Sequence, residues 1–215
     1  MLLSIEGKYI RRKEDLVNNR YTYVVVQDAP LDSSLVLMVS NILPLCEYHD
    51  RVLVFIHKYS TFDNGIIFQA LANAVKSVRR DYVVAINALD QEFQKGNFTL
   101  QRMWYETQKP QKIFEYLCKI LADIEGTPDE SLLTVLYKHL LIATDGEIHQ
   151  LVYFLLQQAI FPFLEMLGKW IYYGIVDDKF NEFMIVEQSS SSLEIKGENF
   201  DWMERFSLNP AKVAE

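Results

Sequence analysis

Residues 161–174, FPFLEMLGKWIYYG, hold more aromatic and aliphatic side chains than a helix facing solvent on all sides would carry. One face of an α-helix would collect Phe163, Leu164, Leu167, Trp170 and Ile171, which recur at i, i+1, i+4, i+7 and i+8. Gly174 follows where a left-handed residue would end that helix. The pattern predicts a helix whose apolar face is covered by the rest of the protein, then an acidic turn at 177–178. The short apolar piece at 182–186 could be a strand or a docked tail.

Upstream of this stretch, apolar residues keep helical spacing from residue 28 onward. Asp32 or Ser33 is placed to cap a first helix, and Pro44 is expected to restart the chain at a first-turn position. Asp63 is expected to cap a long helix that Gly96 ends. About thirty residues of helix would be roughly 45 Å long.

The second half of the helical pattern has its own start and stop signals. Thr99 should begin a helix that Pro110 ends or kinks before Gly126 closes the segment. The capping box at 127–130, TPDE, is the clearest local helix start. Asp145-Gly146 should form a turn, and Pro162 should bend a long helix without ending it.

The two ends of the chain differ from this helical middle. Residues 5–10 and 21–26 are rich in β-forming side chains and predict a small two-stranded ribbon. The predicted domains are therefore a β-ribbon leaning on the helices at 1–27, a helical-bundle domain at 28–187, a flexible Ser-rich linker at 188–198 and an aromatic docking segment at 199–215. The fold class is mainly α, with elongated helical bundles and a small N-terminal β-ribbon.

Composition limits the kinds of partner. The formal net charge of −8 argues against a nucleic-acid surface, and the basic pair Arg79-Arg80 is more simply a solvated face than an interface, although an interface stays possible. No stretch approaches the ~18 apolar residues of a membrane span, so we expect a soluble protein without one. Two cysteines far apart in sequence, Cys46 and Cys118, suit reduced core thiols in the cytoplasm.

No catalytic constellation is evident. Phosphate loops, nucleophile elbows and zinc-ligand pairs do not occur, and His49 and His57 lie eight residues apart, too far for a helical metal pair. Asp177-Asp178 could begin the magnesium motif of an all-α isoprenoid enzyme, but Lys179, Phe180 and Asn181 supply no third carboxylate at the needed spacing. We expect no catalytic, cofactor-binding or metal-binding residues.

A family resemblance is carried by the apolar stretch at 161–174 together with residues 175–184. The motif consists of Pro162, Phe163, Leu167, Trp170, Ile171, Gly174, Asp178, Glu182, Phe183 and Met184. In this order and spacing it resembles the end of the first conserved region of gamma-tubulin complex proteins, closest to their second component. Further matches include residues 7–10, Gly65, 69–71 and 100–104, so the resemblance covers nearly the whole chain. One departure is Lys179, where the family has a proline of fixed φ.

The resemblance implies a non-enzymatic scaffold. Such a protein would make lateral contacts with other gamma-tubulin complex components, so that gamma-tubulin is arrayed for microtubule nucleation at a microtubule-organising centre, either centrosome or spindle pole. Gamma-tubulin itself would be bound by a C-terminal region that this sequence does not contain, and the chain looks like a fragment or a truncated copy. The alternatives are a generic helical tethering or adaptor module and, less favoured, the isoprenoid-type enzyme.

Overall fold

The computed structural model describes residues 2–15, 20–26, 32–96, 98–127, 131–187 and 206–209. Its helices are α1 (Ser33–Tyr59), α2 (Ile66–Gln94), α3 (Leu100–Gly126), α4 (Leu132–Ile142) and α5 (Gly146–Tyr173), with a 3-10 turn at Phe62–Asn64. Its strands are β1 (Ile10–Asp15), β2 (Arg20–Val25), β3 (Ile185–Glu187) and β4 (Phe206–Leu208). Helices make up most of the described residues, and a small antiparallel sheet lies near the N-terminus, which confirms the predicted fold class.

The chain divides into two compact units. Unit 1 comprises Met1–Lys58 and Val75–Ala122, and unit 2 comprises Tyr59–Ala74 and Asp123–Glu215. The predicted domain limits stay predictions, and the Ser-rich linker at 188–198 lies outside the described residues.

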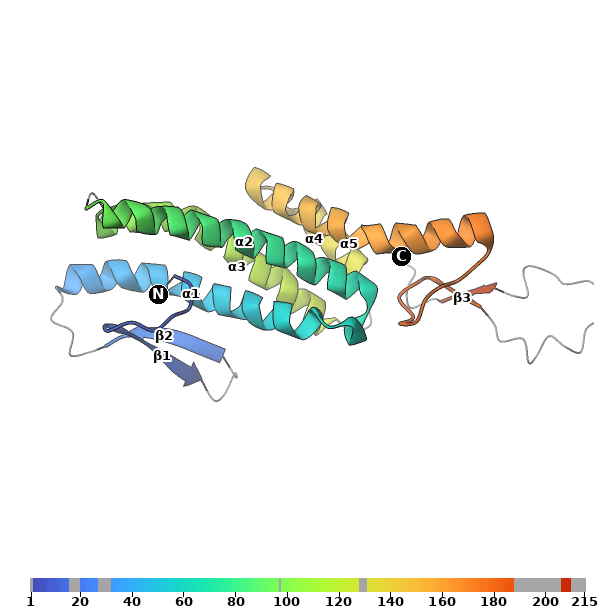
Figure 1. Ribbon diagram of the computed structural model, residues 1–215, viewed down its shortest axis with the longest axis horizontal. Helices are drawn as coiled ribbons and strands as arrows, with labels where there is room; N and C mark the ends of the chain where they lie inside the picture. Colours follow the sequence, from blue (N-terminus) through green and yellow to red (C-terminus); the bar gives the residue numbers. More distant parts are fainter. Residues whose placement is uncertain are drawn as a thin grey trace, which may run out of the picture. The chain divides into compact units, whose positions relative to one another are not determined.

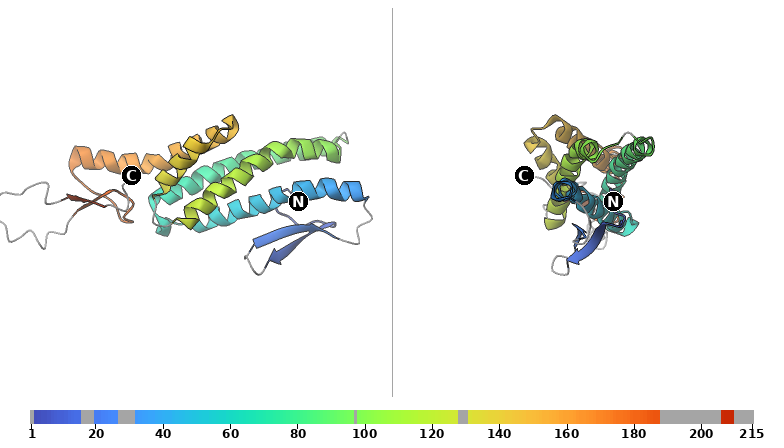
Figure 2. Two further views of the ribbon diagram at one scale, coloured as in Figure 1. Left: turned by 180° about the vertical axis from the view of Figure 1, so that it is seen from behind. Right: turned by 90° about the vertical axis from the view of Figure 1, so that its left-hand side faces the viewer.

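In unit 1, portions of α1, α2 and α3 lie side by side (Figures 1 and 2). Their shared core contains the fully buried Leu45, Val52, Leu117 and Ile120. The Tyr82 and Phe114 rings pack within it, with centroids 4.7 Å apart. The 29-residue α2 confirms the long helix that the sequence predicts.

The N-terminal ribbon packs on α1. Ile10 and Tyr23 form a buried cluster with Leu43 and Cys46. The predicted first strand at 5–10 is wrong, however, because β1 begins only at Ile10 and pairs with β2 from Ile10↔Val25 to Asp15↔Arg20. The strand that follows a short connection pairs with the residues directly before it, and these are the charged residues 11–15 and not the more β-prone segment at 5–9.

Pro44, which the sequence predicts to restart the chain, and Pro110, which it predicts to end or kink a helix, both lie inside helices. α1 continues through Pro44 and α3 through Pro110 as single 27-residue helices, so the expected restart at Pro44 is wrong. A proline removes one helical hydrogen bond, but Ile42, Leu45 and Cys46 around Pro44 are fully buried. Burial of these side chains offsets the lost bond, and tertiary packing overrides the local signal.

In unit 2, α4 packs against α5. The predicted capping box does not start α4, which begins at Leu132 after Ser131, a residue with extended backbone; residues 128–130 of the box lie outside the described residues. Asp145 instead caps α5, where its Oδ1 accepts a hydrogen bond from the Glu147 amide at 3.1 Å.

α5 continues through Pro162 and changes direction part-way along its length (Figures 1 and 2), as predicted. Its covered face carries Leu151, Val152, Leu155, Ala159 and Met166. Two residues of the predicted covered face, Leu164 and Ile171, are instead 51% and 61% exposed. The helical spacing correctly groups the apolar residues, but it does not reveal which of several apolar faces the chain itself covers.

α5 also corrects the expectation about apolar length. Among the described residues, it alone is long and apolar enough to cross a membrane by length and composition, with a mean hydropathy of 1.4 over its best 18 residues. Core helices of other proteins meet the same criterion, so the absence of a membrane span stays a prediction.

Candidate functional site

The helical half of the family motif lies on the second part of α5. The Phe163 ring, half-buried, contacts Phe183 at a centroid distance of 5.5 Å. The Trp170 ring meets Phe206 of β4 edge-on at 6.2 Å, which connects β4 to this helix. Gly174 ends α5 with φ +64°, and its amide donates to the Trp170 carbonyl, as the sequence predicts.

The acidic turn after α5 is ordered by Asp178. Its Oδ1 accepts from the Phe180 amide at 3.1 Å and its Oδ2 accepts from the Phe183 amide at 2.7 Å. The neighbouring Asp177 pairs with Lys169 at 3.0 Å. Both carboxylates therefore have partners within the protein. Asn181 in the same turn has a φ of +54°.

Glu182 connects this turn to a helix far away in the sequence. Its Oε2 accepts from the Ile66 amide at 2.7 Å, and its two carboxylate oxygens each lie 3.2 Å from the Ile67 amide nitrogen. These amides are at the start of α2, where no intrahelical acceptor exists and where the helix dipole favours a negative charge. The cap of α2 thus comes from Glu182, 116 residues away, and not from the predicted Asp63.

Gly65 makes room for the carboxylate. Its φ of +104° is a conformation that side chains disfavour, and a Cβ there would clash with Glu182 Oε1. Burial raises the pKa of the Glu182 carboxyl above its usual range, although the amides of Ile66 and Ile67 partly oppose that rise. We call Gly65, Ile66, Ile67, Asp178 and Glu182 the Glu182 anchor.

A second polar cluster lies in unit 1, around one member of the basic pair. Arg79 is half-buried, and its Nε donates to His49 Nε2 at 3.3 Å, whereas Arg80 is exposed. His49 is fully buried and lies beside the rings of Tyr82 and Phe114. An interface role for Arg79 and Arg80 stays a prediction, but the guanidinium of Arg79 already has a partner within the protein.

The hydrogen bonds of His49 determine which of its two ring nitrogens carries the proton. A guanidinium cannot accept, so His49 Nε2 must accept and Nδ1 must carry the proton that it donates to Ser4 Oγ, 2.7 Å away. The Ser4 hydroxyl in turn donates to the Cys46 carbonyl at 3.3 Å. Burial, and then the charge of Arg79, lower the pKa of His49 to about 4. A neutral imidazole with both nitrogens occupied is a structural group and not a general base.

Tyr23 ties the ribbon to the same cluster. Its hydroxyl donates to Asp50 Oδ2 at 2.7 Å, and Arg12 Nε lies 4.0 Å from the same carboxylate oxygen. Burial and the Asp50 hydrogen bond raise the pKa of the Tyr23 phenol well above its usual range. We call Ser4, Tyr23, His49, Asp50 and Arg79 the N-terminal anchor.

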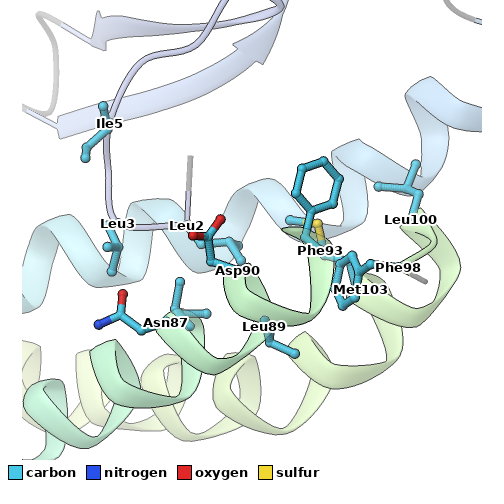
Figure 3. A pocket seen from close by; sticks show the side chains of 11 residues that line it. Leu2, Leu3, Ile5, Asn87, Leu89, Asp90, Phe93, Phe98, Leu100 and Met103 are labelled. Carbon is cyan, nitrogen blue, oxygen red and sulfur yellow. The ribbon is translucent and has the colours of Figure 1, made fainter. Parts of the chain in front are cut away.

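A pocket of about 470 Å³ lies beside the N-terminal segment (Figure 3). Leu2, Leu3 and Ile5 contribute to its wall from the N-terminal segment. The rest of the lining comes from the end of α2, from Phe98 in the connection that follows, and from the start of α3, and it includes Asp90, Phe93 and Met103. The Asp90 carboxylate accepts from Gln94 Nε2 at 2.9 Å. The pocket is mostly apolar and lacks a convergent set of titratable groups.

Other groups that could carry chemistry are already engaged. In the part of the chain that the structure describes, no three His, Cys, Asp or Glu side chains are grouped to hold a metal ion. Cys46 and Cys118 are buried, and burial raises the pKa of each thiol to about 12. Thiols in this state are weak nucleophiles.

Sequence reasoning named Asp178, Glu182 and Phe183 without assigning their contacts, and it missed the role of His49 and Tyr23. A glycine directly before a helix that lacks an acidic first turn was the available signal for the Glu182 anchor. The N-terminal anchor had no comparable local signal, because its members come from separate segments of the chain.

Comparisons with known proteins agree with these motifs. The model of the family "Gamma tubulin complex component N-terminal" matches residues 1–215. Mouse gamma-tubulin complex component 2 is 28% identical over 218 residues, covering 99% of this chain and 24% of its own length. The Arabidopsis thaliana component 2 is 28% identical over 214 residues, covering 96% and 31%.

A fission-yeast relative, the spindle pole body component alp4 of Schizosaccharomyces pombe, is 19% identical over 264 residues, covering 98% of this chain and 34% of its own length. The chain thus spans about a quarter to a third of the relatives that it matches. Because the family model matches along the whole sequence, the chain belongs to the gamma-tubulin complex component N-terminal family.

Proposed function

We propose that this chain is a non-enzymatic scaffold module of a gamma-tubulin complex. In this role it makes lateral contacts with neighbouring components, so that gamma-tubulin is arrayed for microtubule nucleation. The observation that carries the proposal is the family match along all 215 residues, which supports a role in the gamma-tubulin complex. The names of the relatives, two components 2 and a spindle pole body component, support a place at a microtubule-organising centre.

The contacts of the motif residues support a structural role. Asp178 and Glu182 accept hydrogen bonds from backbone amides, and Phe163 and Trp170 pack against Phe183 and Phe206. Groups engaged in this way stabilise the positions of helix ends and strands. Because these side chains are engaged inside the protein, we infer that the module acts through its surfaces and not through reactive side chains. In this proposal gamma-tubulin is gripped by another part of the complex proteins.

The test is co-purification. A tagged chain, shown to be folded by circular dichroism, is expected to retain other gamma-tubulin complex components from cell extract. The comparison variant is the same chain carrying Gly65→Ala. This variant should lose the Glu182 anchor and should therefore retain less of the other components. A folded chain that retains vesicle-tethering proteins and no gamma-tubulin complex component would support the generic adaptor and end this proposal.

A further inference from the structure

Among the residues that the structure describes, one side of α5 is left uncovered, and this side carries a second apolar stripe. Phe161, Leu164, Gly168, Ile171 and Ile175 follow one another at alternating intervals of three and four residues, the spacing of a helix–helix seam. Phe161 is 68% exposed, and Leu164 and Ile171 are more than half exposed. Ile175 lies just past the end of the helix and is also exposed.

Gly168 lies at the middle of this stripe. A Cβ built there meets no atom within 4 Å, so the space in front of the glycine is open. Helices approach one another as closely as the side chains at their crossing allow. A glycine at the centre of an exposed apolar seam therefore offers a crossing point for a second helix.

The stripe is nearly symmetric about that glycine. Leu164 lies four residues before it and Ile171 three after, while Phe161 and Ile175 lie seven residues to either side. Two copies of α5 that cross antiparallel at Gly168 would place Leu164 of one against Ile171 of the other. Each copy would use the same patch, which is the arrangement of a two-fold dimer.

The area of the patch suits such a dimer. Aromatic side chains cover about 150–250 Å² each, and Tyr172, the neighbour of Ile171, adds a ring that is 82% exposed. Two aromatic and three aliphatic side chains, each more than half exposed, offer on the order of 500–600 Å² in each copy, the area of a small, transient interface.

A lipid bilayer is the other surface that could cover an apolar helix. Glu165 and Lys169 are exposed within this segment, and charges at the centre of a membrane span are costly. The opposite side of α5 is already covered by this protein through Leu155, Ala159 and Met166. We propose that α5 is a dimerisation surface, on which a second copy of this chain packs antiparallel across Gly168.

The test measures the mass of the purified 215-residue chain by sedimentation equilibrium. We expect a reversible dimer with a Kd on the order of 1–10 μM. Ile171→Glu should leave a monomer, and Gly168→Leu should weaken the dimer at least about tenfold, because its side chain would extend into the open space at the crossing point. Val84→Glu is the matched control, because Val84 of α2 is 62% exposed and lies far from the stripe in sequence. The dimer of this variant should have the same Kd as that of the wild type.

Circular dichroism of each variant establishes that it is folded. A wild-type chain that stays monomeric at a concentration of about 100 μM would overturn the proposal. A dimer that survives Ile171→Glu, or one that survives Gly168→Leu unchanged, would overturn it as well. Flotation with phosphatidylcholine vesicles is the parallel measurement. Binding to vesicles by the wild type but not by Ile171→Glu, without a dimer in solution, would assign the stripe to a membrane instead.

Discussion

The N-terminal anchor and the Glu182 anchor perform the same task with opposite chemistry. Each connects a segment beside a small β-sheet to a helix distant in the sequence. The N-terminal anchor depends on a neutral imidazole, His49, whose pKa burial lowers to about 4. The Glu182 anchor depends on a carboxylate whose pKa burial raises. The difference teaches that two buried polar groups with similar structural roles can respond to acid in opposite directions.

The largest expected effect separates the two anchors by mutation. Gly65→Ala introduces a side chain at φ +104° and displaces the Glu182 carboxylate from the Ile66 and Ile67 amides. We expect a loss of about 2–4 kcal/mol in the free energy of unfolding, measured with urea. The matched control is Gly7→Ala, because a Cβ at Gly7 meets nothing within 4 Å. A loss at Gly65 no greater than at Gly7 would contradict the assigned role of Gly65.

Acid should weaken the N-terminal anchor. The unfolded chain protonates His49 near pH 6.5, whereas the folded chain does so only near pH 4. The unfolded state thus binds more protons in this window, and stability is lost as the pH falls through it. We expect up to about 3 kcal/mol of loss from pH 7 to pH 4 from this residue. The check is the free energy of unfolding measured between pH 7 and pH 4. His49→Gln should make it depend less on pH in this range, and an unchanged dependence in that variant would contradict the prediction.

Removing one hydroxyl tests the contact between the ribbon and α1. Tyr23→Phe deletes the donor to the buried Asp50 carboxylate and leaves the ring packing intact. Hydrogen bonds to charged groups are worth about 1.5–3 kcal/mol, so we expect a loss in that range in thermal or urea unfolding. Tyr9→Phe is the control, because the Tyr9 side chain is 41% exposed. Equal losses for the two variants would show that the Asp50 contact adds nothing.

The smallest effect concerns the charge of Glu182. Glu182→Gln keeps an acceptor for the Ile66 amide and removes a charge that burial disfavours, so we expect a loss under about 1 kcal/mol at pH 7. The folded state takes up the Glu182 proton at higher pH than the unfolded state. The wild type therefore gains stability from this group on acidification, and the cost of Glu182→Gln should be greater at pH 5 than at pH 7. A cost that shrinks at pH 5 would mean that the pKa is lowered and not raised.

Signals confined to one helix turn were predictable from the sequence. Gly174 ends α5 in the left-handed conformation, and Thr99 Oγ1 accepts from the Arg102 amide at the start of α3. The ribbon and the long α2 were also predictable, because residue type and spacing determine them locally.

Features that depend on distant partners were not predictable. The acceptor that caps α2 is Glu182, and no local pattern connects it to Gly65. The sequence predicts a break at Pro44 because a proline always removes a helical hydrogen bond. The burial of Leu45 and Cys46, which offsets that loss, depends on tertiary contacts that the local sequence does not show. Similarly, spacing identifies two apolar sides of α5 but gives no information about which one the chain covers.

The most direct test of the central claim is binding between purified proteins. The chain is immobilised, and purified gamma-tubulin complex components are passed over it in increasing concentration. A scaffold module of this complex should bind saturably, with an affinity that Glu182→Gln leaves nearly unchanged and Gly65→Ala reduces. Absence of saturable binding by the folded wild-type chain would contradict the claim.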